Sequence, residues 1–192
     1  GQLGAMHDAE GLAAGVEALQ AERAAGKVNF QFMVNGAGAR RLGGLSGAKG
    51  VELAATLPSV EWRREASRQQ IGLVALTPGG MHVCLPSKVH AMMAAGLAII
   101  AICPEQSDLA LLVRGTGAGW VVDNTGKTAM ETGRAFAAVV RELIAHPDRV
   151  HAARQSARRA AETTYGHEEI SRQWSEFVAT ACVVGIKQHD QG

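Results

Sequence analysis

Short apolar runs alternate along this chain with stretches in which apolar residues recur at helical spacing. The apolar runs have the length and composition of strands, and they cover residues 28–34, 51–53, 71–76, 97–102 and 120–122. The helical stretches include residues 8–25, 58–68, 86–96 and 107–114. Strands that alternate with helices predict a parallel sheet covered on both faces, as in Rossmann-like α/β folds.

The last third of the chain is predicted to be helical. Thr128 and Glu131 have the spacing of a capping box, and His146-Pro147 predicts the end of the helix that this box starts. Two more helices are expected at residues 148–163 and 167–183. The pattern therefore predicts a Rossmann-like lobe over residues 1–165, followed by a C-terminal helix and tail over residues 166–192.

The segment 71–102 carries the clearest functional signal. Its first apolar run stops at Pro78-Gly79-Gly80, and a helix opens at Pro86-Ser87-Lys88. Proline suits a first helical position, and a serine hydroxyl can accept a bond from a free amide at a helix start. Beyond the carboxyl end of a parallel strand, a helix start is a place where anions bind, and Lys88 adds a full positive charge. The segment therefore predicts phosphate binding.

Size and charge narrow the possible partners. The 192 residues suit one domain or one lobe of a larger enzyme, and 19 basic against 18 acidic residues argue against a large nucleic-acid interface. Cys84, Cys103 and Cys182 are widely spaced and are expected to be buried free thiols. No apolar run has the length of a membrane span. Because the chain starts at Gly1 in what looks like a functional loop ending at Gly4, we expect it to begin within a longer protein.

Six short motifs follow one another along most of the chain. They are GQLG (1–4), FMVNGAGARR (32–41), IGLVAL (71–76), PSKVHAMMAAG (86–96), PEQSDLALLV (104–113) and GAGWVV (117–122). In this order they resemble the carboxyl-terminal, donor-binding lobe of GT-B retaining glycosyltransferases. The subgroup that the Pro-Ser-Lys helix start resembles most is the bacterial cell-surface polysaccharide enzymes. No single motif is very specific, so the resemblance rests on all six in register, from Gly1 to about Phe177.

The resemblance implies a reaction and a missing partner. Such enzymes transfer a sugar from a nucleoside diphosphate sugar to a polysaccharide or glycolipid acceptor, with retention and without a bound metal or other cofactor. Their active site lies between two lobes, and this chain has no counterpart of the acceptor-binding lobe. That lobe would belong to the same polypeptide or to a partner subunit, with residues 166–192 packed toward it. The resemblance thus implies a cytoplasmic enzyme, incomplete and inactive as this chain alone, whose complete form associates peripherally with the inner face of the membrane.

Lys88 is the predicted catalytic residue, because it would neutralise the departing diphosphate. Pro86 and Ser87 would present the helix start to the same group, and Gly79 and Gly80 would let the backbone approach the sugar or its phosphate. A surface lysine, a plain helix cap and an ordinary connecting turn are the alternative interpretations of these residues.

Further donor contacts are expected on neighbouring loops. His82 would touch the donor sugar, the amides of Gly1 and Gly4 would face the diphosphate, and the turn at Gly36 and Gly38 would lie under the nucleotide. Arg40 or the adjacent Arg41 would lie near phosphate. Surface arginines, turn glycines and an exposed loop histidine remain the alternatives. The GxGxxG fingerprint of dinucleotide-binding folds is incomplete here, because Arg41 occupies the third glycine position.

Some residues depart from the family pattern. Val83 and Ala91 stand where many members carry two glutamates, and Gln2 and Glu10 stand where basic residues are common. A non-catalytic or bipartite nucleotide-sugar-binding subunit is therefore an alternative function, and a sugar-nucleotide epimerase is a weaker one. The sequence contains no Asp-x-Asp or HExxH motif, and it predicts no metal site.

Overall fold

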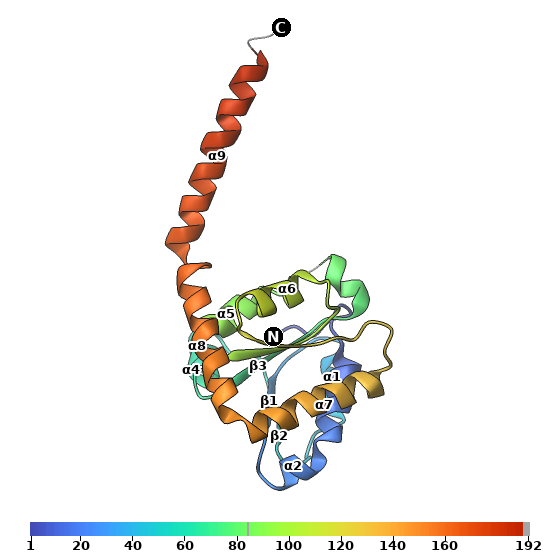
Figure 1. Cartoon of the computed structure of the whole chain (residues 1–192). Coiled ribbons are helices and arrows are strands. Elements are labelled where there is room, and N and C mark those ends of the chain that lie inside the picture. The colour runs from blue at the N-terminus through green and yellow to red at the C-terminus, as the bar shows by residue number, and fades with distance from the viewer. Residues whose placement is uncertain (84, 190–192) are drawn as a thin grey trace.

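The computed structural model describes residues 1–83 and 85–189 and has the predicted α/β architecture, with parallel strands and helices on both sides (Figure 1). Its strands are β1 (Phe30–Met33), β2 (Val51–Ala54), β3 (Ile71–Ala75), β4 (Ala98–Ile102) and β5 (Gly119–Val122). Its helices are α1 (Ala9–Ala18), α2 (Gln20–Ala24), α3 (Ala39–Gly43), α4 (Ser59–Ala66), α5 (Lys88–Ala94), α6 (Asp108–Gly115), α7 (Ala129–Ala145), α8 (Pro147–Thr163) and α9 (His167–His189), with one 3-10 helix, η1 (Pro78–His82).

The strands form two sheets where the sequence predicts one. Strands β3, β4 and β5 pair in that order, while β1 pairs only with β2 among the named strands. Beyond the end of β1, the chain pairs with the first residues of the protein: Leu3 N donates to Asn35 O at 2.8 Å, and Asn35 N donates to Gly1 O at 2.9 Å. The segment that starts at Gly1 therefore lies beside the end of β1.

The three-stranded sheet is covered on both faces. Ile100 and Ile102 of β4 belong to one buried cluster with residues of α1 and α7, whereas Ile99 and Ala101 belong to a second cluster with residues of α5, α6 and α8. Because successive side chains of a strand point to opposite faces, this division places one helical layer on each side of the sheet (Figure 1). Two-sided burial explains why the run at 97–102 is continuously apolar.

Local capping confirms several predicted helix ends. The capping box of Thr128 and Glu131 is present, and the Ser107 side chain accepts a bond from Ala110 N at 3.2 Å at the start of α6. Gly96 follows α5 with a φ of 75°, a conformation that favours glycine. The single helix predicted over 8–25 is divided in two at Leu19, which is fully buried and leaves helical geometry with a ψ of 19°.

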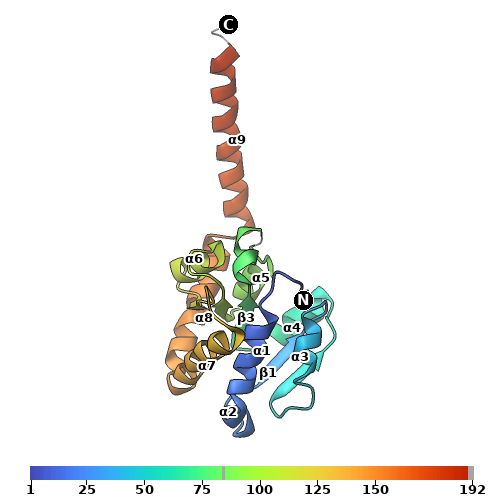
Figure 2. The same ribbon diagram turned by 90° about the vertical axis from the view of Figure 1, so that its right-hand side faces the viewer.

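Helix α9 extends away from the rest of the chain in both views (Figures 1 and 2). The side chains of Trp174 and Phe177 are 64% and 65% exposed and contact each other at a ring separation of 5.9 Å. Trp120, by contrast, packs against the first buried cluster. None of the described helices is both long enough and apolar enough to cross a membrane.

Only one of the three cysteine predictions falls on a described side chain. Cys103 is a buried free thiol at the end of β4, as predicted. Cys84 and the side chain of Cys182 lie outside the part of the chain that the structure describes.

Candidate functional site

The predicted phosphate-binding residues gather where three segments meet beyond the carboxyl end of β3. These segments are residues 1–7, the turn that contains η1, and the start of α5. Thr77 N donates to Met6 O at 2.9 Å, which joins the first two segments. Lys88, the first residue of α5, joins the third, because its Nζ would lie 2.8 Å from a Cβ placed on Gly1. Segments far apart in sequence therefore form one continuous surface.

Lys88 is an exposed cation that lacks a carboxylate partner in the described part of the chain. Other basic side chains do form ion pairs with carboxylates. Arg41, for example, pairs with Glu10 at 2.7 Å. An unpaired positive charge near the carboxyl ends of parallel strands suits an anionic ligand. The position of Lys88 at the start of α5 agrees with the sequence prediction.

Ser87 does not cap α5 as predicted. Its backbone is already helical, with a φ of −55° and a ψ of −22°, and its side chain makes no capping hydrogen bond. A capping side chain needs an extended backbone in order to reach the free amides two or three residues later. The bond that closes the first turn is a backbone one, from Val89 N to Pro86 O at 3.0 Å. The exposed Ser87 hydroxyl has no hydrogen-bond partner in the described residues.

The predicted glycine loop after β3 is the 3-10 helix η1, and its two glycines differ. A Cβ on Gly80 would lie 2.6 Å from Met6 O, so this buried glycine permits contact with the first loop. The Thr77 side chain accepts a bond from Gly80 N at 3.2 Å and fixes the turn. Gly79 is exposed, with no atom within 4 Å of the corresponding position. Of the two, Gly79 is the residue with open space in front of it. His82, at the end of η1, is also exposed.

Gly36 and Gly38 serve the packing of the first loop. Gly36 has a φ of 96°, and a Cβ there would lie 3.0 Å from Gln2 Oε1. A Cβ on Gly38 would lie 2.9 Å from Leu3 O, which accepts a hydrogen bond from Gly38 N at 2.8 Å. The space beside both glycines is therefore filled by Gln2 and Leu3 of the first loop. Gly4, by contrast, has open surroundings.

The two arginines after this turn have different surroundings. Arg41 forms ion pairs with two acids of α1, Glu10 at 2.7 Å and Glu17 at 3.2 Å. The alternative that Arg41 serves phosphate is thus not favoured, because its charge is already matched. Arg40 is exposed and has no ion pair with any residue that the structure describes.

His7 joins the site although the sequence gives no signal for it. Its side chain is half-buried, and Gly4 N donates to Nδ1 at 3.1 Å. Burial lowers the pKa of His7, and the nearby Lys88 ammonium lowers it further. His7 is therefore neutral at pH 7. Only the fold brings Lys88 to it, across 81 residues of sequence.

A second unpredicted element ties the start of α1 to the strand ends. Asp8 caps α1 by accepting a bond from Gly11 N at 2.8 Å. Its other carboxylate oxygen accepts a bond from Asn124 Nδ2 at 2.9 Å, and the same amide donates to Leu76 O at 2.8 Å. Asn124 is 2% exposed, and its Oδ1 is buried and has no hydrogen-bond partner among the described residues. This bridge fixes the residues that follow His7 against β3 and β5.

Two arginines of α8 donate hydrogen bonds to the C-terminal end of α5. Arg154 Nε donates to Gly96 O at 2.8 Å, and Arg158 donates to Ala94 O. Cations at a helix C-terminus satisfy free carbonyls and complement the helix dipole. These two arginines therefore stabilise the C-terminal end of α5. Arg159, on the same helix, has no described residue that accepts a bond from its guanidinium.

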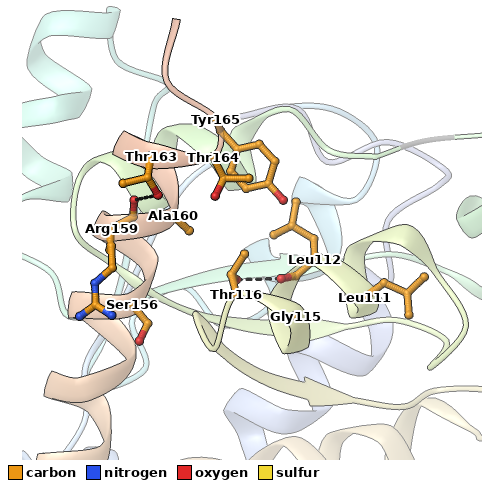
Figure 3. A pocket seen from close by; sticks show the side chains of 10 residues that line it. All are labelled: Leu111, Leu112, Gly115, Thr116, Ser156, Arg159, Ala160, Thr163, Thr164 and Tyr165. Atoms are coloured by element: carbon orange, nitrogen blue, oxygen red, sulfur yellow. Dashed lines mark hydrogen bonds between the residues drawn. The ribbon is translucent and has the colours of Figure 1, made fainter. Parts of the chain in front are cut away.

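A separate groove of about 380 Å³ lies between α6 and α8 (Figure 3). Hydroxyl groups line much of it, and two of them bond to nearby backbone: Thr116 donates to Leu112 O at 2.7 Å and Thr163 to Arg159 O at 2.9 Å. None of the predicted site residues lines this groove. Among the side chains that the structure describes, no three from histidine, cysteine, aspartate or glutamate group closely enough to hold a metal ion.

The surface around Lys88 thus combines an unpaired ammonium, a neutral imidazole and two glycines with open surroundings. Such groups can attract an anion and donate hydrogen bonds to it, with backbone free to come close. A comparison of the chain with protein-family models finds no match, and a comparison with curated protein sequences finds none either. The functional argument therefore rests on the residues and their geometry.

Proposed function

We propose that this chain binds the nucleoside diphosphate sugar of a glycosyltransferase and is the donor-binding half of that enzyme. The complete enzyme would transfer the sugar, with retention and without a bound metal, to a polysaccharide or glycolipid acceptor. The observation that carries the proposal is Lys88, an unpaired cation that lies against Gly1 beyond the carboxyl end of β3. The acceptor-binding lobe would be supplied by the same polypeptide or by a partner subunit.

The proposed chemistry requires positive charge at the leaving group. When the bond between sugar and diphosphate breaks, negative charge grows on the diphosphate, and preorganised cations and N–H donors stabilise it. Lys88 would supply the charge. Gly79 and Gly4 have open space in front of them and would allow the diphosphate to approach the backbone. Ser87 and His82, both exposed on the same surface, remain candidate contacts for the donor.

A non-catalytic nucleotide-sugar-binding subunit is the second candidate function. Val83 is 67% exposed beside η1, and Ala91 is exposed on α5. Because both side chains are apolar, neither position offers a carboxylate to hold a ribose. Both candidates require nucleotide binding, and they differ in turnover. Sugar transfer by the chain together with its acceptor lobe would distinguish an enzyme half from a binding subunit.

Calorimetric titration with uridine and guanosine diphosphates tests the shared claim. The wild type should bind at least one of them, and Lys88→Ala should weaken that binding by about 10- to 100-fold, the range for losing one charge-assisted contact. Lys27→Ala is the matched control, because Lys27 is exposed and precedes β1, at the opposite end of the strands. No binding by the wild type, or equal affinities for wild type and Lys88→Ala, would overturn the proposal.

A further inference from the structure

The hydrogen bond between Gly4 and His7 fixes where the imidazole carries its proton. Gly4 N donates to Nδ1 at 3.1 Å, so Nδ1 is the unprotonated nitrogen. A neutral imidazole has one donor and one acceptor, and the proton must therefore be on Nε2. No residue in the described part of the chain accepts a hydrogen bond from Nε2. His7 thus holds an unused N–H donor in a half-buried position.

Lys88 is the charged group that acts on this imidazole. It comes from α5, and its positive charge disfavours a second positive charge on His7. The carboxylate of Asp8, at the start of α1, is bonded to Gly11 N and to Asn124. His82 is the titratable residue of η1, and its side chain is exposed. In the free protein, Lys88 and His7 are therefore two donors that carry a single positive charge between them.

We propose that His7 is a second diphosphate-contacting residue, which donates from Nε2 beside Lys88 and takes up one proton from solvent when the diphosphate binds. The inference rests on the proposed function and deepens it, because it makes donor binding dependent on pH. The added proton goes to Nδ1, which can then no longer accept a bond from Gly4. The Gly4 amide is thereby released, and the open space beside Gly4 leaves room for a ligand to approach it.

The sign of the effect follows from the charges. Without ligand, burial and the Lys88 charge lower the pKa of His7. A bound diphosphate brings more than one negative charge to the pair, so the anion favours the protonated imidazole and raises its pKa. An increase of about one pKa unit corresponds to about tenfold stronger binding of the diphosphate once the pH lies below both pKa values. Affinity should therefore rise as the pH falls.

His7→Gln separates this role from a structural one. A glutamine can accept a bond from Gly4 N and offer an N–H group, but it does not take up a proton. Wild type and His7→Gln should bind uridine diphosphate with similar affinity at about pH 8, and the wild type should bind about tenfold better than the variant once the pH lies below both pKa values of His7. The phosphate groups of the ligand titrate as well, but they do so equally for both proteins and cancel in the ratio. His151→Gln, at an exposed position of α8, is the control.

Nuclear magnetic resonance of the His7 ring completes the test. At about pH 8 the free wild type should have its proton on Nε2, and uridine diphosphate or inorganic pyrophosphate should raise the His7 pKa by about one unit. If a nucleotide binds but the His7 pKa and the affinity ratio stay constant, the inference fails and the proposed function stands. If only pyrophosphate binds and raises that pKa, the inference stands and nucleotide recognition fails. If neither ligand binds, both are wrong.

Discussion

Two adjacent glycines of η1 allow a direct test of the site at the scale of single residues. In Gly80→Ala, the new methyl group would lie 2.6 Å from Met6 O, so η1 and the first loop must move apart. We expect a loss of about 1 to 3 kcal/mol in the free energy of unfolding, as for other overpacked positions. Gly79→Ala meets no atom within 4 Å and should be nearly neutral. Denaturant unfolding of both variants makes the comparison, and equal losses would contradict the described contact.

Single residues also mark the limit of what sequence predicts. The position of Lys88 at a helix start follows from local chemistry, because Pro86 and Gly96 bound the helix in sequence. The partners of Arg41 are 31 and 24 residues away, so nothing local distinguishes it from Arg40. The role of His7 depends on its bond to Gly4 and on a helix that follows much later in the chain.

At the scale of elements, arginines of α8 stabilise the end of α5, the helix that begins with Lys88. Arg154→Ala removes the side chain that donates to Gly96 O just beyond the end of α5. We expect a loss of about 1 kcal/mol in the free energy of unfolding, because a charged donor at a helix C-terminus is replaced by water. Arg159→Ala on the same helix removes no such bond and is the matched control. Thermal unfolding is the measurement, and equal stabilities of the two variants would refute the support from α8.

The elements themselves were largely predictable, and their pairing was not. Apolar runs, Gly96 and the Thr128 capping box place the strands and helix ends within a few residues. The break at Leu19 depends on where its side chain is buried, which the spacing of apolar residues does not reveal. The first residues pair with Asn35, which is far away in sequence. Strand pairing is a long-range property, and periodicity alone does not fix it.

At the scale of the whole molecule, two places on the described surface need to be distinguished as ligand sites. One is the surface around Lys88, beyond the end of β3. The other is the groove between α6 and α8, which has a volume of about 380 Å³ but contains no predicted site residue (Figure 3). Helix α9 projects from this body with Trp174 and Phe177 exposed, and its packing toward an acceptor lobe stays a prediction.

Mapping of backbone amide chemical shifts during a titration with uridine and guanosine diphosphates tests the location of the site most directly. The proposed site predicts saturable shifts in residues 1–8, 77–83 and 87–89, and smaller shifts in the same residues of Lys88→Ala at equal ligand concentration. Residues 111–116 and 156–165, which include the groove between α6 and α8, should stay unchanged. Shifts confined to that groove, or no saturable shifts with either nucleotide, would contradict a donor site at Lys88.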